Sequence, residues 1–450
     1  MALTEKLKLS EKIGYGLGDA AFNFVWMTFI YFQIFFYTDV FGISAAAIGT
    51  MLLVTRVWDT VNDPIMGMLA DRTNTRWGKF RPYLLFGAIP LGIAATLAFT
   101  TPNMSPENRL IYAYVTYFLV GMVYTALNIP YSSMMSVMTN DPKERASLSS
   151  WRFVGAYGAG ILVLHFTFDL VERFGQGDQA LGFQRTMALY GCVLAAMLMV
   201  TFATTKERIK PVNSGHKSFW KELKILISTG PFLVLFIVGI FSLSFVAMRN
   251  GITMHYFKYF LNDEASAKWF LVGGSICNLI GAGATNWLTR YWDKKNVYIV
   301  LAFINAIMMG SIYLIGANNL PLLYVIHFAS SLLSGPTIPI VFAMYADIVD
   351  YQEANKGVRT SGLVFAGASF SQKMGWTVGG AATGFLLAFF GYEPNVEQSE
   401  SAITGIQWMF TLVPGALAVF GALAMYWYRL DEKAMNDIQS ALDVRKAEST

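Results

Sequence analysis

The sequence carries little charge. Of its 450 residues only 14% are Asp, Glu, Lys or Arg, whereas 55% are hydrophobic and 15% are aromatic. Water-soluble domains carry about 25% charged residues, so this composition argues against a water-soluble protein. The sequence also contains no nucleotide-binding loop and no nucleophile–base set. We therefore expect neither an enzyme nor an organic cofactor.

Cysteine is scarce as well. The two cysteines, Cys192 and Cys277, both fall inside apolar runs. We expect small, buried packing residues at these positions rather than a disulfide or a metal site.

Long apolar runs dominate the chain instead. A run of roughly 20 residues is long enough to cross a ~30 Å hydrocarbon core, and such runs recur along the whole sequence. The predicted spans lie at about 14–37, 44–70, 82–102, 109–138, 148–170, 184–205, 231–261, 266–290, 297–317, 321–346, 360–391 and 402–428. The first run contains Asp19 and is too long for a cleaved signal peptide, so we expect it to remain as a helix. The pattern predicts an all-α polytopic membrane protein of twelve transmembrane helices.

The positions of Lys and Arg predict the orientation of these helices. With the N-terminus in the cytoplasm, the cytoplasmic segments hold 24 of the 33 basic residues and the opposite side holds four. This bias predicts a multi-pass protein of the cell (inner) membrane with both termini in the cytoplasm. The net charge of +4 is explained by this topology, and we infer no nucleic-acid partner from it.

The longest polar connection, 206–229, divides the predicted helices into six plus six. It is basic and amphipathic. We therefore predict an N-terminal half at 1–205, a C-terminal half at 230–429 and a cytoplasmic tail at 430–450. Two such halves that rock about a central site hold their ligands near the bilayer midplane.

A short charged loop follows the second run, between Gly67 and Tyr83. Its one acid, Asp71, can pair at a helix end with the basic residues Arg72, Arg76 or Arg81. Such a cluster would hold helix ends together in one conformation, so we predict a conformational gate at these four residues. Plain positive-inside charge is the alternative interpretation.

Two carboxylates lie within the second run, where ionisable groups are costly. Asp59 and Asp63 are four residues apart and Asn62 is three from Asp59, so their oxygens share one helical face. Hard oxygen ligands and two neighbouring negative charges suit a small monovalent cation such as Na⁺, Li⁺ or H⁺, and we predict no other metal. The alternative is that Arg56, three residues before Asp59, neutralises one acid in an internal ion pair.

A second polar set suits a polyhydroxylated ligand. Its members combine aromatic rings with hydrogen-bonding groups inside apolar helices, which is the mixture that a sugar requires. They are Asp19, Asn23 and Trp26; Tyr124, Thr125, Asn128, Tyr131 and Ser132; Arg152; and Gln372, Lys373 and Trp376. Lys373 has no acid within a turn, so we expect its partner on another helix, with Asp59 or Asp63 as the leading candidates.

Arg249 is a further buried cation, in the seventh run. Tyr256, two turns later, shares its helical face. Together with Arg152 and Lys373 it would make the pocket positive and favour an anionic sugar. A structural pairing with an acid or a carbonyl is the equal alternative. His327, a single histidine on an apolar helix, is expected to be a satisfied core group rather than a proton carrier.

Four motifs carry a resemblance to a known family. They are VWDTVNDPIMG at 57–67, RWGKFRPYLLFG at 76–87, YTALNIPY at 124–131 and QKMGW at 372–376. The sequence resembles the glycoside-pentoside-hexuronide:cation symporters, which include the melibiose permease, along nearly its whole length. The resemblance implies the major facilitator fold, the cytoplasmic membrane, and symport of a glycoside with Na⁺, Li⁺ or H⁺.

The resemblance also implies roles for individual residues. Asp59 and Asp63, with Asn62 and Thr125, match the cation site, and Lys373 matches the lysine that links the cation and sugar sites. Asn23 and Asn128 stand where melibiose permease has sugar-binding aspartates, so we expect a less acidic pocket and a sugar other than melibiose.

Two rival functions fit the same scaffold. One is transport of an amphipathic lipid, and the other is a non-transporting sugar sensor, for which a costly cation site would have no use. We expect the partners to be a small sugar or glycoside, a monovalent cation and the lipid bilayer, and we expect a functional monomer.

Overall fold

The computed structural model describes residues 6–139, 141–209, 219–317, 319–357, 361–438 and 440. Apart from one isolated bridge, the regular structure in these ranges is helical, which confirms the predicted all-α class. The chain divides into two compact units. Unit 1 comprises Met1–Asn213 with Glu393–Val396, and unit 2 comprises Ser214–Tyr392 with Glu397–Thr450.

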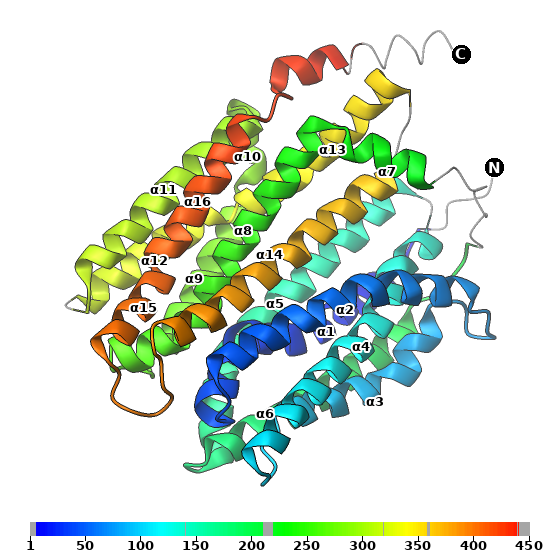
Figure 1. The fold of residues 1–450 in the computed structure, drawn as a ribbon. Helices are drawn as coiled ribbons and strands as arrows, with labels where there is room; N and C mark the ends of the chain where they lie inside the picture. Colours follow the sequence, from blue (N-terminus) through cyan, green and yellow to red (C-terminus); the bar gives the residue numbers. More distant parts are fainter. Residues whose placement is uncertain are drawn as a thin grey trace. The chain divides into compact units, whose positions relative to one another are not determined.

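Unit 1 contains six long helices, coloured blue to green in Figure 1. They are α1 (Leu9–Phe35, continued by the π-helical η1, Phe36–Val40), α2 (Ala45–Arg72), α3 (Arg81–Ala98), α4 (Pro106–Met138), α5 (Pro142–Gly175) and α6 (Gln179–Thr204). The innermost helix, α1, packs against α5 and α6. Further contacts join α5 to α6, α3 to α4 and α6, and α2 to α4.

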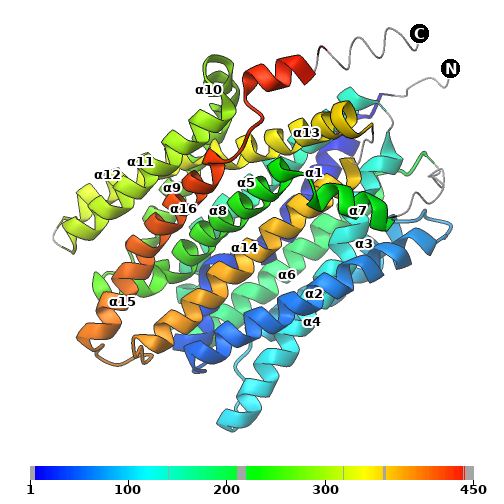
Figure 2. The ribbon, with the colours of Figure 1, turned by 45° about the horizontal axis from the view of Figure 1, so that its top comes forward.

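Unit 2 begins with the short amphipathic helix α7 (Phe219–Ile227), which lies in the predicted middle loop. Its other helices are α8 (Gly230–His255, continued by the π-helical η2, Tyr256–Phe260), α9 (Ala267–Gly283), α10 (Thr285–Tyr291), α11 (Lys294–Ile315), α12 (Leu320–Ser334), α13 (Thr337–Lys356), α14 (Ser361–Phe389), α15 (Glu400–Phe410) and α16 (Leu412–Tyr426). Helices α11, α16, α8 and α14 run side by side in Figures 1 and 2.

The two units repeat one packing pattern. In unit 1, α1 packs on α5 and α6, and α3 packs on α4 and α6; in unit 2, α8 packs on α14 and α16, and α11 packs on α12 and α16. Both central helices also end in five π-helical residues, η1 and η2. Because π-turns are rare, their recurrence at the same place supports a structural repeat.

Nine helical segments among the described residues are long and apolar enough to cross a membrane. They are Leu9–Val40, Arg81–Ala98, Pro106–Met138, Ser147–Gly175, Gln179–Thr204, Gly230–Phe260, Lys294–Ile315, Leu320–Lys356 and Glu400–Tyr426. The other three predicted spans fall on α2, which carries Arg56 and three aspartates; on α9, which has 17 residues; and on α14, which carries Lys373. The predicted count of twelve is therefore not fully confirmed.

Both cysteines are free, as predicted. The prediction that they are buried was wrong, because Cys192 on α6 is exposed and Cys277 on α9 is half-buried. An apolar run has an outward face as well as an inward one, and its composition does not distinguish between them.

Glycine allows α5 and α1 to cross closely. A Cβ atom at Gly155 would lie 2.2 Å from the carbonyl oxygen of Gly16 and 3.4 Å from the amide nitrogen of Ala20. Unit 2 uses the same device where α14 crosses α8, since a Cβ atom at Gly375 would lie 2.9 Å from the carbonyl oxygen of Ile240. Backbone atoms cannot yield to such contacts, so no larger residue fits at either crossing.

The loop between α2 and α3 is held by Glu207, which follows α6. Its carboxylate accepts hydrogen bonds from the backbone nitrogens of Lys79, Phe80 and Arg81, at 2.7, 2.7 and 2.9 Å. These are donors that the start of α3 would otherwise leave unpaired. Gly78 permits the approach, because its φ is +111° and a Cβ atom there would lie 2.6 Å from the carboxyl carbon of Glu207.

The predicted gate residues lie around this loop. The guanidinium of Arg81 donates to the carbonyls of Trp77 and Phe202, at 3.2 and 2.6 Å, and lies 4.5 Å from the ring of Phe202. Arg72 is exposed, as is Arg76, whose guanidinium lies 4.1 Å from the ring of Trp77. The side chain of Asp71 lies outside the described residues.

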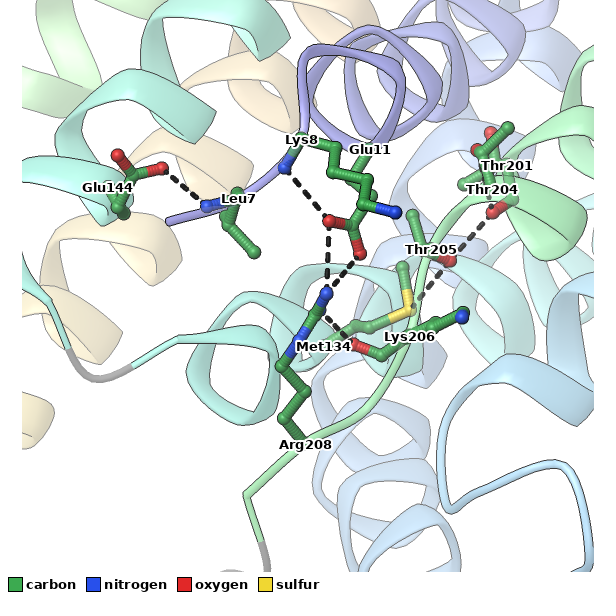
Figure 3. A network of polar contacts seen from close by, with 10 residues as sticks. All are labelled: Leu7, Lys8, Glu11, Met134, Glu144, Thr201, Thr204, Thr205, Lys206 and Arg208. Carbon is green, nitrogen blue, oxygen red and sulfur yellow. Dashed lines mark hydrogen bonds and ion pairs between the residues drawn. The ribbon is translucent and has the colours of Figure 1, made fainter. Parts of the chain in front are cut away.

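A second network ties the first residues of α1 to the segment after α6 (Figure 3). Glu11 is only 3% exposed, and its carboxylate pairs with the guanidinium of Arg208 at 2.8 Å. The backbone nitrogen of Arg208 donates to the carbonyl of Val137 on α4, at 2.8 Å. Glu144 on α5 accepts from the backbone nitrogen of Leu7. The ends of α1, α4, α5 and α6 are thereby joined within unit 1.

We expect Gly155→Ala to destabilise the protein by about 1–3 kcal/mol, because the added methyl meets fixed backbone atoms. Gly158→Ala is the matched control on the same helix, since a Cβ atom there meets nothing within 4 Å. That control is expected to be neutral or slightly stabilising. Thermal unfolding of the purified protein measures both, and equal shifts in Tm would contradict the close crossing.

We expect Glu207→Ala to leave the three donors at the start of α3 without their acceptor, at a cost of about 1–3 kcal/mol. Hydrogen exchange at the amides of residues 79–81 should accelerate, and Glu207→Gln should have a smaller effect because it keeps one acceptor oxygen. Lys206→Ala, at an exposed neighbouring position, is the control. Unchanged exchange in Glu207→Ala would show that the cap is unimportant.

Candidate functional site

One face of α1 supplies the first part of the candidate site. Asp19, Asn23 and Trp26 lie at intervals of four and three residues, so the helical period places them on one side of α1. All three are half-buried. The Asn23 amide donates to the backbone carbonyl of Asp19 at 2.8 Å, which occupies one of its two donors and orients the side chain.

Arg152 of α5 reaches this face. Its Nη2 and Nε atoms donate to Oδ1 of Asp19, at 2.9 and 3.2 Å. Its guanidinium also lies 5.2 Å from the ring of Tyr131 on α4 and 5.9 Å from that of Tyr15 on α1. Arg152 is one turn before Gly155, so the close crossing of α5 and α1 brings the arginine to the aspartate.

An aromatic pair lies beside this ion pair. The rings of Trp26 and Tyr124 stack with centroids 5.8 Å apart and an interplanar angle of 30°. Phe22 packs edge-on against Tyr124 at 5.5 Å. Stacked rings next to charged hydrogen-bonding groups form a surface that can take the apolar face of a sugar ring and its hydroxyl rim.

The carboxylates of α2 lie against α4. Asp59 is 8% exposed, and its Oδ2 pairs with Nη1 of Arg56 at 2.9 Å. Oδ1 of Asp63 accepts a hydrogen bond from the Thr125 hydroxyl at 3.3 Å. Asn62 is 6% exposed, and its Nδ2 atom has no hydrogen-bond partner in the described part of the chain. Asp59, Asn62 and Asp63 thus lie within about one turn of α2, and Asp63 contacts Thr125 of α4.

The donor set fits a hard monovalent cation. Two carboxylates, one amide and one hydroxyl are oxygen-rich ligands, and no His or Cys is among them. Among the described residues, no three His, Cys, Asp or Glu side chains gather into a cluster that suits a transition metal. A buried amide with an unused polar atom is a group that a ligand or a rearrangement would satisfy.

Arg56 connects the carboxylates of α2 to the aromatic pair of Trp26 and Tyr124. It pairs with Asp59, and its guanidinium also lies 5.2 Å from the ring of Trp26. The internal ion pair that the sequence offered as an alternative is therefore present. It joins Arg56 to Asp59, whereas the described contact of Asp63 is with the Thr125 hydroxyl.

The other predicted ligand residues lie on α4, α8 and α14. Asn128 is half-buried on α4 in unit 1, whereas Lys373 and Trp376 are half-buried on α14 in unit 2. The guanidinium of Arg249 contacts Nδ1 of His327 at 2.7 Å and lies 5.4 Å from the ring of Phe410. Arg249 is 7% exposed, so its described contacts lie within the core of unit 2.

Sequence reasoning did not identify three features of this region. Neither the cap by Glu207 nor the pair of Glu11 with Arg208 was predicted, because their partners are more than 100 residues apart in the chain. His327 was expected to be a satisfied core group and is one, but its partner Arg249 was not foreseen. Of these three features, only the cap had a signal in the sequence, because Glu207 is an acid within a basic stretch.

Sequence relatives cover nearly the whole chain. The inner membrane symporter YicJ of Escherichia coli is 37% identical over 443 residues, which are 98% of this chain and 96% of the relative. The isoprimeverose transporter of Lactiplantibacillus pentosus is 35% identical over 430 residues, 94% of this chain and 89% of the relative.

Solved structures and a family model agree with these relatives. The crystal structure of a D-xylose-proton symporter matches with a TM-score of 0.68 at 15% identity, covering 93% of this chain and 97% of that one, which confirms the major facilitator fold. The model of the family described as MFS/sugar transport protein matches residues 14–432. This chain is therefore a multi-pass membrane protein that belongs to the MFS/sugar transport protein family.

Proposed function

We propose that the protein imports a sugar or glycoside, a pentoside or hexuronide included, together with Na⁺, Li⁺ or H⁺ by alternating access. The observation that carries the proposal is the adjacency, within unit 1, of a buried carboxylate cluster on α2 and an aromatic and ionic surface on α1, α4 and α5. The names of the relatives, a symporter and an isoprimeverose transporter, support the same conclusion.

The cation would bind at Asp59 and Asp63, with Asn62 and Thr125 beside them. Arg56 supplies one positive charge to this cluster, through Asp59. A bound cation would supply the second, at Asp63. Asp59 is buried and Asp63 is half-buried, and two acids on one face of an apolar helix are groups that attract a monovalent cation.

The sugar would bind on the surface formed by Trp26, Tyr124 and the pair of Asp19 with Arg152. Asn23 and Asn128 would add neutral hydrogen-bonding groups, and Trp376 would add a ring from unit 2. Arg249 and Lys373 would favour an anionic sugar if they face it. Because Arg56 contacts both Asp59 and Trp26, occupation of the cation site would alter the sugar surface directly.

Lys373 would pair with the carboxylates of α2 in the empty protein and would be released in part when the cation arrives. Its ammonium would then donate to a sugar oxygen, so that one side chain responds to both ligands. Such mutual enhancement of binding is a reciprocal coupling of roughly 1–3 kcal/mol. We propose that a monomer carries out the whole cycle in the cell (inner) membrane, with both termini in the cytoplasm.

We expect Asp63→Asn to abolish accumulation of sugar against a gradient, because the proposed cation site loses one of its two carboxylates. Downhill exchange of sugar should persist. Uptake into vesicles with and without a Na⁺ or H⁺ gradient measures both processes. Asp169→Asn, an exposed carboxylate on α5, is the control. Full gradient-driven accumulation by Asp63→Asn would refute the assignment.

We expect Lys373→Ala to reduce the mutual enhancement of cation and sugar binding more than it weakens either ligand alone. Lys373→Arg should fail as well, because a planar guanidinium does not replace a compact ammonium. Calorimetry gives the sugar affinity with and without saturating Na⁺ for each variant. If the ratio of these affinities in Lys373→Ala equals that of the wild type, the coupling runs through other residues.

A further inference from the structure

A cavity of about 510 Å³ lies between α2, α3 and α4 in unit 1. Apolar side chains line almost all of it, including Phe86, Leu119 and Val123. Phe86 is 61% exposed and Leu119 is 40% exposed, so the cavity opens on the outer surface of two helices that are apolar enough to span a membrane. Helices α2, α3 and α4 lie together in both views (Figures 1 and 2).

The cavity has one polar group at its inner end. Asn62 lines it, is 6% exposed, and has an Nδ2 atom without a hydrogen-bond partner in the described ranges. A buried amide without a partner is unusual in a native protein and indicates a ligand or a second conformation. The unused donor would suit the π-electrons of a double bond in an unsaturated chain.

The other end of the cavity is polar and lies next to positive charge. Thr73 and Tyr83 line it and join their hydroxyls at 2.6 Å. The loop between them carries Arg76 and Lys79, and Arg72 directly precedes it, on the predicted cytoplasmic side. Basic clusters at that level of a membrane attract anionic lipid headgroups.

The length of the cavity matches one leaflet. Asn62 and Thr73 are eleven residues apart along α2 and its cap, which is about 16 Å at the helical rise of 1.5 Å per residue. That length is about half of the ~30 Å hydrocarbon core. A volume of 510 Å³ is also within the range of pockets that enclose a ligand.

We propose that this cavity binds one acyl chain of an anionic phospholipid, whose phosphate contacts the basic loop between α2 and α3. The chain would run along α4 to Asn62, which borders the carboxylate cluster of α2. The bound lipid would be a resident of the inner leaflet rather than a transported substrate. This proposal does not depend on the identity of the sugar or of the coupled ion.

Native mass spectrometry of the purified full-length protein tests the site, with phosphatidylglycerol and phosphatidylcholine titrated separately. Val123→Phe fills the cavity from α4 and should weaken binding of the first phosphatidylglycerol at least fivefold. Val115→Phe is the matched control, two turns earlier on the same helix at an exposed position outside the cavity. Equal affinity in the two variants would overturn the proposal.

The headgroup contact is tested separately. Arg76→Gln together with Lys79→Gln should reduce the preference for phosphatidylglycerol over phosphatidylcholine several-fold. If the wild type binds both lipids equally, the anionic headgroup has no role and the proposal fails in that respect.

A measurement on the wild type guards against misfolding of Val123→Phe. Phosphatidylglycerol with a photoactivatable diazirine near the end of its acyl chain should label peptides that contain residues 62–66 or 119–127. Labelling that is spread evenly over the exposed helices would show ordinary annular lipid and would overturn the proposal. Sugar uptake takes no part in these measurements, so their failure is distinguishable from failure of the proposed transport function.

Discussion

The high cost of charge inside an apolar helix bundle governs this molecule. A charged side chain within a membrane helix costs several kcal/mol unless it has a partner or water. Three acids of unit 1 that are buried or half-buried are accordingly paired: Asp19 with Arg152, Asp59 with Arg56, and Glu11 with Arg208. Each pair joins positions that must stay together, either within the candidate site or at the ends of helices.

Backbone packing makes such pairing possible. The pair of Asp19 with Arg152 requires α1 and α5 to approach closely, and glycine at the crossing allows this. Unit 2 has the same crossing between α8 and α14, two residues after Lys373. Arg152 in unit 1 and Lys373 in unit 2 therefore each lie close to a glycine at which two helices cross. This relation follows from the repeat and is visible only when the helices are packed.

The candidate site combines groups whose chemistry differs. One carboxylate of α2 accepts a hydrogen bond from Thr125 of α4, whereas the surface beside the carboxylates is built of stacked rings and a half-buried ion pair. Arg56 touches both parts. A change of charge at the carboxylates therefore acts on the aromatic surface through the side chain of Arg56 alone.

The sequence by itself determined the class of protein and the chemistry of its polar residues. Scarce charge, repeated apolar runs and the interval of four between Asp59 and Asp63 are local properties, and helical geometry converts them into faces. Only the tertiary structure decided which of those faces meet. Arg249 pairs with His327 and Glu207 caps α3 because helices far apart in the chain pack together, and Cys192 faces outward because α6 buries its other side. Pairings of this kind depend on long-range packing, which the local pattern of a sequence does not contain.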